Sequence, residues 1–223
     1  MGGNSISLIP AAYLPYLPAF LIVAAYLLGS LPFAVIVTRG MGMADPRSYG
    51  SGNPGATNVL RSGNKVAAVL TLLGDAAKGW FAVWLVHLLT PAPVSSALVA
   101  AVGFVALLGH VFPIFIGFKG GKGVATAAGV FLGFSGGLAL ACIAVWLAVA
   151  LITRYSSLAS ICAALAAPLF ALWWLDSTQA TALLGMSMLV IWRHQQNIRN
   201  LFAGTESRIG KRGKDKDQEA SNS

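Results

Sequence analysis

Seven apolar segments separated by short polar joints make up most of this chain. They cover residues 16–38, 65–89, 94–111, 122–135, 137–153, 158–175 and 179–194. A helix needs roughly 20 apolar residues to cross the hydrocarbon layer, and fewer where protein shields part of it. The pattern therefore predicts an all-α integral membrane protein, a polytopic bundle of about seven transmembrane helices. The fourth segment is short and glycine-rich, so a version with five spans, in which one apolar pair is merged or re-entrant, stays open.

The basic residues lie in alternate joints and indicate an orientation. The first, third and fifth joints and the end of the last segment carry Arg39, Arg47, Arg61, Lys65, Lys119, Lys122, Arg154, Arg193 and Arg199. The joints at 90–93, 134–137 and 176–179 carry no Lys or Arg. Because cytoplasmic loops are enriched in these residues, we expect the N-terminus outside and the C-terminus in the cytoplasm.

The composition agrees with a membrane protein. Of the 223 residues, 57% are hydrophobic and 10% are charged, whereas a soluble domain carries about 25% charged residues. The net charge is +8, but the basic residues lie between apolar segments or in the tail and not along one soluble face, so nucleic acid is a poor partner. We expect a single membrane-embedded domain over residues 1–202. Residues 203–223 are polar and without periodicity, which is typical of a disordered cytoplasmic tail.

The long first loop, residues 38–65, is rich in Gly, Ser and Asn. Loops of more than about 12–15 residues are usually functional or disordered. Within it, "SGNPGATN" and the arginine that follows offer hydrogen-bond donors and a fork-shaped cation for an anion, namely Ser51, Asn53, Thr57, Asn58 and Arg61. An ordinary polar loop with positive-inside arginines explains the same residues equally well.

A second glycine-rich cationic element, "FKGGKG", lies at 118–123. It is not a Walker P-loop, because no glycine precedes the "GK" at the required spacing and no Ser or Thr follows it. Glycines free the backbone N–H groups to surround an anion, and a helix N-terminus is expected to begin near Gly123. The sequence therefore predicts a phosphate cradle made of Lys119, Gly120, Gly121, Lys122, Gly123 and Thr126.

Two further polar elements end or begin apolar segments on the same side. "TRYSSLAS" at 153–160 places Arg154 beside Ser157 and Ser160, although Ser157 as a helix N-cap is an equal alternative. "RHQQN" ends the last segment, and its His194 and Asn197 are three residues apart, which puts them on one helix face. A lone His at a membrane edge is more often interfacial than catalytic, but three neighbouring polar elements favour a role in the site.

Two opposite charges lie inside the second segment. Asp75 and Lys78 are three residues apart, and ionisable groups within a membrane are usually paired or directed into the bundle. We interpret them as an ion pair with a structural role. His110, which precedes Pro113, is interpreted as a packing or capping residue.

The four polar elements contain cations, amides and hydroxyls but almost no carboxylates. Carboxylates are the groups that normally hold a divalent metal in phosphate chemistry. The pattern therefore predicts a substrate that bears phosphate, bound at the membrane surface by cations and backbone amides, with no metal or other cofactor.

Six strings in this order closely resemble the bacterial acyl-phosphate-dependent glycerol-3-phosphate acyltransferase (PlsY) family: "GSLPFAV" (29–35), "GSGNPGATNVLR" (50–61), "DAAKG" (75–79), "GHVFPIFIGFKGGKGVAT" (109–126), "TRYSSLAS" (153–160) and "HQQNIRNLFAGTE" (194–206). The resemblance implies a multi-pass enzyme of the bacterial cytoplasmic (inner) membrane. Such an enzyme transfers a fatty acyl group from acyl phosphate to the 1-hydroxyl of glycerol 3-phosphate, giving lysophosphatidic acid and phosphate in phospholipid synthesis. Its partners would be these two substrates, membrane lipid and an upstream enzyme that forms acyl phosphate.

By this resemblance, the two glycine-rich elements hold phosphates, and Ser157, His194 and Asn197 close the site. We hypothesise that Arg61 with Lys119 or Lys122 offsets the charge that grows during transfer, and the proton acceptor is either His194 or a phosphate oxygen of the substrate. An anion transporter is the rival hypothesis, but such a protein is expected to show inverted repeats and polar groups near mid-membrane. No repeat is found, and the four polar elements cluster at one face. A non-catalytic lipid-binding scaffold would leave the glycine-lysine element without a purpose.

Overall fold

The computed structural model describes residues 10–210, and the regular elements in this range are all helical. In chain order they are η1 (Ala11–Tyr16), α1 (Leu17–Ser30), α2 (Phe33–Gly40), η2 (Pro46–Ser48), α3 (Ala56–Arg61), α4 (Lys65–Leu89), α5 (Ser96–Val111), η3 (Ile114–Ile116), α6 (Val124–Phe134), α7 (Gly136–Thr153), α8 (Ser156–Trp174), α9 (Ser177–Arg193) and α10 (Gln195–Phe202). The six later apolar segments each contain one of the helices α4 to α9, as the hydrophobic pattern predicts.

The first apolar segment, predicted as one helix over 16–38, is two helices. Leu31 leaves the helical region, with φ −61° and ψ 115°, and α2 starts after Pro32. A proline disfavours the α conformation of the residue before it and lacks the N–H that a continuing helix needs. The single-helix prediction is therefore wrong, and the break places the Leu31 carbonyl where a side chain can reach it.

Five helical stretches among residues 10–210 are long and apolar enough to cross a membrane. They are Ala12–Ser30, Lys65–Leu89, Ser96–Ile116, Gly136–Thr153 and Ser156–Trp174. Helix α6 has 11 residues and α9 has 17, so both are short for a full crossing. The count of seven spans stays a prediction.

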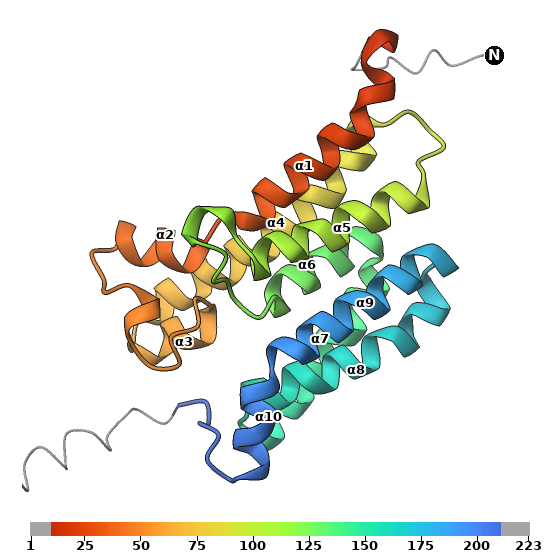
Figure 1. The fold of residues 1–223 in the computed structure, drawn as a ribbon. Coiled ribbons are helices and arrows are strands. Elements are labelled where there is room, and N and C mark those ends of the chain that lie inside the picture. Colours follow the sequence, from red (N-terminus) through yellow and green to blue (C-terminus); the bar gives the residue numbers. More distant parts are fainter. Residues whose placement is uncertain (1–9, 211–223) are drawn as a thin grey trace, which may run out of the picture.

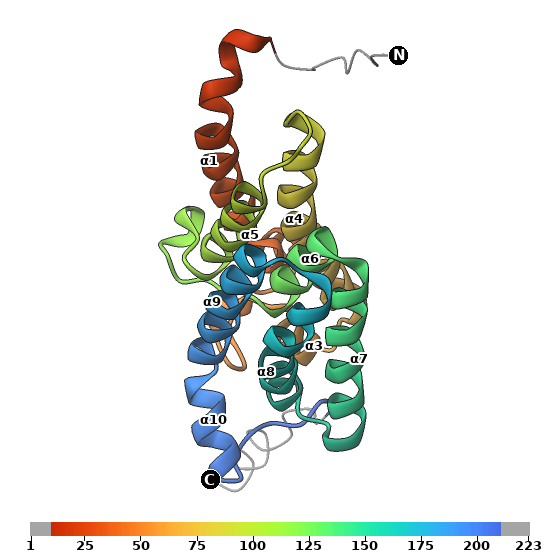
Figure 2. The same ribbon diagram turned by 90° about the vertical axis from the view of Figure 1, so that its right-hand side faces the viewer.

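The long helices form two groups, which Figures 1 and 2 show from perpendicular directions. One group contains α1, α4, α5 and α6, and the other contains α7, α8 and α9. Helix α6 packs against α7, and α5 against α9, so one apolar core joins the groups. Buried side chains such as Leu107, Val130 and Met186 belong to it.

Glycines bring α4 and α6 into close contact. A Cβ atom added at Gly79 would collide with the backbone oxygen of Thr126, and one added at Gly129 with that of Ala76. The two backbones therefore approach where a side chain on either residue would hold them apart. Small residues serve this purpose at helix contacts in membrane proteins, and here they place the start of α6 beside the middle of α4.

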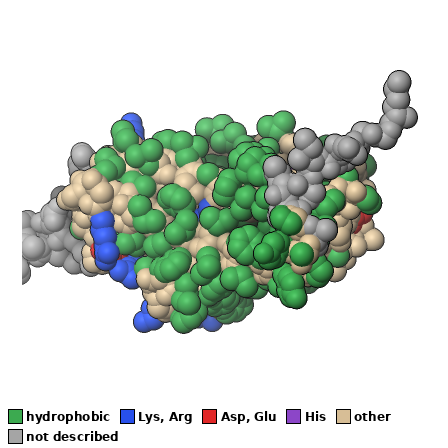
Figure 3. Space-filling view, turned by 90° about the horizontal axis from the view of Figure 1, so that it is seen from above, with side chains coloured by type: hydrophobic (Ala, Val, Ile, Leu, Met, Phe, Trp, Pro, Cys, Tyr) green, Lys and Arg blue, Asp and Glu red, His purple; other side chains and the backbone are tan. Residues whose placement is uncertain are grey.

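The outer surface is largely apolar. Hydrophobic side chains cover much of the face in Figure 3, and Leu151 and Ile152 are 79% and 83% exposed. Such a surface suits lipid and not water. The short helices α2 and α3 lie at the end of the first group away from the start of α1, and α10 lies at the same end of the second group (Figure 1); the basic joints are at that end.

Candidate functional site

A cavity of about 890 Å³ lies between the two groups of helices. It combines polar residues at the end of the bundle that carries α3 and α10 with apolar residues deeper between the helices. Most of the predicted site residues line it: Ser51, Asn53, Thr57, Asn58, Arg61, Lys122, Gly123, Ser157, Ser160, His194 and Asn197. Tertiary packing therefore brings together elements that are more than 100 residues apart in the sequence.

Asn58 organises the first loop from within. Its Oδ1 accepts a hydrogen bond from the Ser51 N–H at 3.0 Å, and its Nδ2 donates to the carbonyls of Pro46 and Tyr49 at 2.6 and 3.2 Å. Gly50 has φ +59°, and a Cβ there would strike Asn58 Oδ1. Asn58 is predicted to donate to a ligand, but the structure uses its amide to shape the loop.

The cation of the first loop lies at the cavity mouth. Arg61, the last residue of α3, is exposed and donates from Nη2 to Ser207 Oγ. Beside it, the hydroxyls of Thr57 and Ser156 lie 3.1 Å apart. The loop thus meets both the start of α8 and the C-terminal segment.

The second glycine-rich element, residues 117–123, forms a turn that we call the glycine-lysine turn. It ends at Gly123, which has φ +85° and caps α6, so the helix begins where the sequence predicts. Lys122 points to the cavity and donates from Nζ to Asn197 Oδ1. The pKa of Lys122 is lowered to about 8, mainly by burial and also by the charges of Arg61 and Arg193, while Glu206 opposes the shift.

The two lysines of this turn differ in position. Lys119, predicted as a catalytic residue, is exposed and does not line the cavity, because it precedes the bend that directs Lys122 inward. Gly120 and Gly121 line a second, small cavity of about 10 Å³, which shares Asp75 and His110 with the large one. Thr126 is fully buried, and its hydroxyl is 3.1 Å from His110 Nδ1. The geometry thus gives no support to Lys119 or Thr126 as ligands of a substrate in the large cavity.

His194 directly follows α9 and lines the polar part of the cavity. Its Nδ1 is 2.7 Å from the Val190 carbonyl; a carbonyl can only accept, so we assign the proton to Nδ1. Burial lowers the pKa of His194 to about 4, and the Val190 bond opposes this shift. At neutral pH the ring is therefore uncharged, with Nε2 free to accept a hydrogen bond.

A carboxylate that the sequence analysis did not single out completes the polar wall. Glu206 accepts hydrogen bonds from Ser157 Oγ at 2.6 Å, Asn197 Nδ2 at 2.7 Å and Asn200 Nδ2 at 3.3 Å. The Ser157 hydroxyl is used in this bond, and the N-cap of α8 is Tyr155, so the alternative of Ser157 as N-cap is wrong. Glu206 is the last residue of the string at 194–206 that resembles the family, so the resemblance could have identified it as a site residue.

Residues 203–210 do not fit the disordered tail predicted from residue 203. They form an ordered segment across the end of the bundle, which we call the strap. Glu206 accepts a hydrogen bond from Ser157, Ser207 accepts one from Arg61, and the Ile209 N–H donates to the Arg154 carbonyl at 2.7 Å. Arg154 also donates from Nη2 to the Ile209 carbonyl at 3.0 Å and does not line the cavity, so it anchors the strap. A charged segment can be ordered when its charges are paired by the fold; the rest of the predicted tail, 211–223, lies outside the described residues.

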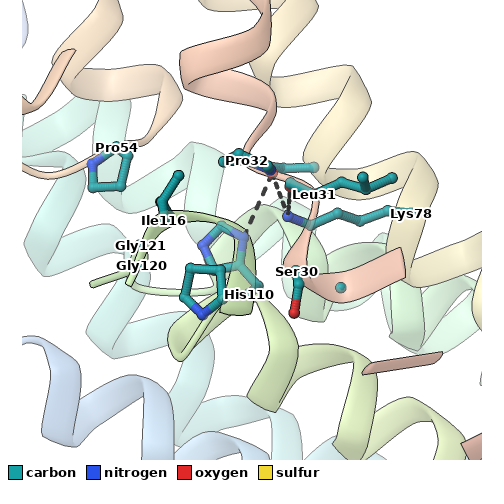
Figure 4. Close-up of a pocket in the computed structure, with 12 residues that line it drawn as sticks. Ser30, Leu31, Pro32, Pro54, Lys78, His110, Ile116, Gly120 and Gly121 are labelled. Carbon is teal, nitrogen blue, oxygen red and sulfur yellow. Dashed lines mark hydrogen bonds and ion pairs between the residues drawn. The ribbon is translucent and has the colours of Figure 1, made fainter. Parts of the chain in front are cut away.

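The predicted ion pair inside the second segment is confirmed. Lys78 Nζ lies 2.8 Å from Asp75 Oδ1, with both side chains almost fully buried. Lys78 also donates to the Leu31 carbonyl at 2.7 Å. Figure 4 shows Lys78 and His110 with Gly120 and Gly121 around the small cavity, and His110 Nδ1 is 3.5 Å from Asp75 Oδ1.

A family model described as glycerol-3-phosphate acyltransferase matches residues 19–204. The chain belongs to the glycerol-3-phosphate acyltransferase family. Relatives named glycerol-3-phosphate acyltransferase include those of Bordetella petrii, 55% identical over 89% of this chain and 96% of the relative, and Ralstonia nicotianae, 59% identical over 86% and 94%. That of Laribacter hongkongensis is 58% identical over 85% and 94%.

Two crystal structures of PlsY (YgiH), an integral membrane glycerol 3-phosphate acyltransferase, have the same fold as this acyltransferase. The glycerol 3-phosphate form superposes with TM-score 0.81 at 39% identity, covering 86% of this chain and 96% of that chain. The lysophosphatidic acid form gives TM-score 0.79 at 38% identity, covering 86% and 95%. The family match runs from α1 into the start of the strap and so includes the candidate residues that line the cavity, up to Asn197.

Proposed function

We propose that this chain transfers a fatty acyl group from acyl phosphate to the 1-hydroxyl of glycerol 3-phosphate, releasing lysophosphatidic acid and phosphate. One observation carries the proposal: a single cavity of about 890 Å³ joins a cationic polar wall to an apolar interior. An acyl donor with a phosphate leaving group needs both environments, and its acceptor needs a second anion site. The forms in which the related PlsY was crystallised name such an acceptor and such a product.

The polar wall offers the groups that two phosphates need. Lys122 and Arg61 supply charge from two different loops, and the uncapped backbone N–H groups at the start of α6 adjoin Lys122. Cations and helix N-termini both favour phosphate. We infer that Lys122 and Arg61 bind the phosphate groups. Lys119 lies outside the cavity, so we infer that it is a surface cation that does not contact the substrates.

The apolar interior is suited to the acyl chain. It is lined by α4, α6, α7, α8 and α9, with side chains such as Leu72, Phe131, Ile143, Leu147 and Met186. Leu72, Ile143 and Leu147 are also among the exposed apolar residues. The cavity therefore reaches the lipid-facing surface, where an acyl chain could enter from the membrane.

The chemistry demands orientation more than activation, because acyl phosphate is already a reactive donor. The 1-hydroxyl oxygen attacks the acyl carbon, the bond from that carbon to the phosphate oxygen breaks, and the hydroxyl proton must be accepted. We infer that His194 Nε2 accepts a hydrogen bond from the hydroxyl and orients it. With a pKa of about 4, His194 is a weaker base than a phosphate oxygen, whose second pKa is about 6. The departing phosphate is therefore the better acceptor of the proton.

The distribution of basic residues indicates how the protein is oriented in the membrane. We propose that the end with α2, α3 and α10 faces the cytoplasm of a bacterial inner membrane and that the N-terminus is outside, because the basic joints lie at that end. Both phosphate substrates are then reached from the cytoplasm. A cytoplasmic enzyme that forms acyl phosphate is the partner this arrangement requires.

The test of this function is a phosphate-release assay on purified protein in detergent, with palmitoyl phosphate and glycerol 3-phosphate, each alone and together. We expect release only when both are present, with lysophosphatidic acid formed in equal amount. The same rate in EDTA is expected if no metal takes part. Folded protein that releases no phosphate would contradict the proposal and favour an anion transporter.

A further inference from the structure

A buried polar cluster lies beside the glycine-lysine turn and has no role in the chemistry proposed above, although two of its members, Asp75 and His110, also line the large cavity. It consists of Asp75 and Lys78 from α4, His110 from the end of α5 and Thr126 from the first turn of α6. Their side chains are nearly or fully buried, with residue exposures of 3%, 4%, 7% and 0%. Charged groups inside a membrane protein are costly, so apolar side chains would join these helices at lower cost if packing were their only role.

The contacts within the cluster fix the ring of His110. Its Nδ1 lies 3.1 Å from Thr126 Oγ1 and 3.5 Å from Asp75 Oδ1. Asp75 is in turn held by Lys78, whose ammonium also binds the Leu31 carbonyl at the break between α1 and α2. Three helices, α4, α5 and α6, and the break after α1 therefore determine where this imidazole lies.

The other side of His110 supports the glycine-lysine turn. The Gly121 N–H donates to the His110 carbonyl at 3.3 Å, and the Gly120 N–H donates to the next carbonyl, that of Val111, at 3.2 Å. A Cβ added at Gly121 would collide with His110 Nε2, and Figure 4 shows the turn passing beside the ring. The side chain of His110 thus sets how closely the turn approaches α5.

On the side away from His110, the turn is held by the end of α9. Arg193 donates from Nη2 to the Gly120 carbonyl at 3.0 Å and from Nε to the Gly121 carbonyl at 3.3 Å. Gly120 and Gly121 are therefore held between Arg193 on one side and His110 on the other. The next residue is Lys122, so a shift of this pair moves the ammonium that faces the cavity.

We propose that His110, held by Asp75 and Lys78, is a positioning residue that sets the place of Lys122 at the phosphate-binding wall. This inference rests on the proposed function, since it assigns the cluster a part in substrate binding. His110 acts through the turn and not on the reacting atoms. Its loss should raise KM for the substrate that Lys122 binds and leave kcat nearly unchanged.

The experiment compares kcat and KM of the wild type with His110→Leu, Lys122→Met and the double variant. His110→Leu should raise KM by about 10- to 100-fold, the range expected for one lost hydrogen bond to a charged group, for the same substrate as Lys122→Met. The double variant should be no worse than Lys122→Met alone, because both changes act on one interaction. His110→Asn, which keeps an amide near the position of Nδ1, should retain a KM within about threefold of the wild type.

Gly121→Ala changes the same contact, that between the turn and the His110 ring, from the side of the turn, and it is useful if His110→Leu does not fold. Its methyl group meets His110 Nε2, so KM should rise. Adding His110→Asn, whose side chain is shorter, should restore it. Thr71→Val is the matched control, because Thr71 is fully buried on α4, bonds within its own helix to the Ala67 carbonyl and lines neither cavity.

The proposal is overturned if KM is unchanged in His110→Leu, if the effects on KM are additive in the double variant, or if adding His110→Asn does not restore the KM of Gly121→Ala. A loss of kcat in His110→Asn would also overturn it, since His110 would then act on the reacting atoms. Turnover of the wild type with both substrates is measured first. Its absence would count against the function, whereas the variant ratios test only the positioning.

Discussion

At the scale of single residues, His194 combines a buried, uncharged ring with a free Nε2. The Val190 carbonyl holds Nδ1–H at 2.7 Å, and burial keeps the pKa at about 4. A histidine in this state can accept a hydrogen bond from a substrate hydroxyl at neutral pH. It is not tuned to carry a proton there, because an efficient general base has a pKa near the working pH.

His194→Gln tests this distinction. Glutamine can place Oε1 near the position of Nε2 and accept the same hydrogen bond, but it cannot take a proton. We expect kcat to stay within about tenfold of the wild type while KM for glycerol 3-phosphate rises, because a general base normally contributes about 10²–10⁴-fold. Steady-state kinetics from pH 5 to 8 measures both. A loss of kcat of about 10³-fold at every pH with KM unchanged would instead make His194 the base.

Lys122 should give the enzyme an alkaline limit. Its pKa is lowered from 10.5 to about 8, so its charge is present below that pH and is lost as the pH rises through it. We expect kcat/KM for the substrate that it binds to fall about tenfold per pH unit above pH 8. Arginine keeps its charge at all these pH values, so Lys122→Arg should remove the limit. The same fall in the arginine variant would show that another group titrates.

At the scale of the elements, the contact of α4 with α6 positions the start of α6. It depends on Gly79 and Gly129, each of which meets a backbone oxygen of the other helix. The cluster of Asp75, Lys78 and Thr126 is built on the same two helices. Widening this contact would therefore disturb both the packing and the site.

Gly129→Ala should destabilise the protein by about 1–3 kcal/mol, the usual cost of overpacking a filled contact. The added methyl group meets the Ala76 backbone oxygen, and a backbone atom cannot move aside as a side chain can. Thermal unfolding in detergent should show a Tm several degrees lower. Gly136→Ala is the control, since nothing lies within 4 Å of a Cβ there, and its Tm should be almost unchanged. Equal Tm values for both variants would contradict the close contact.

At the scale of the whole molecule, the fold divides into two chemically different ends. The end with α2, α3 and α10 carries the cations, the glycine-lysine turn and the strap, whereas the joints at 90–93, 134–137 and 176–179 lie at the other end. The site belongs to the first end, so the orientation of the chain determines which side of the membrane supplies its polar substrates.

Cysteine labelling in cells measures that orientation. In a background in which Cys142 and Cys162 are alanine, Ser62→Cys and Gly136→Cys each place one thiol at an exposed position, at opposite ends. A membrane-impermeant maleimide should label Gly136→Cys in intact cells and Ser62→Cys only after permeabilisation, because the basic joints are retained in the cytoplasm. The reverse pattern would overturn the orientation, and labelling of the unsubstituted background would show leakage.

The sequence by itself determined the helical membrane architecture, the buried Asp75–Lys78 pair and eleven of the residues that line the cavity. These follow from local rules: long apolar segments must form helices in lipid, opposite charges one turn apart pair, and glycine with lysine at a helix start favours anions. Apolar length alone predicts one helix over 16–38, whereas Pro32 takes Leu31 out of the helical conformation and divides the segment into two helices.

Only the tertiary structure decided which of these groups meet. Lys119 and Lys122 are equivalent in the sequence, but the turn directs the half-buried Lys122 to Asn197 and leaves Lys119 exposed. Glu206 lies in a segment with the composition of a tail, and its order depends on Ser157 and Asn197. His110 looked like a packing residue until α4, α6 and the turn were seen around it. Contacts between residues far apart in the chain are set by helix packing, and no local pattern contains that information.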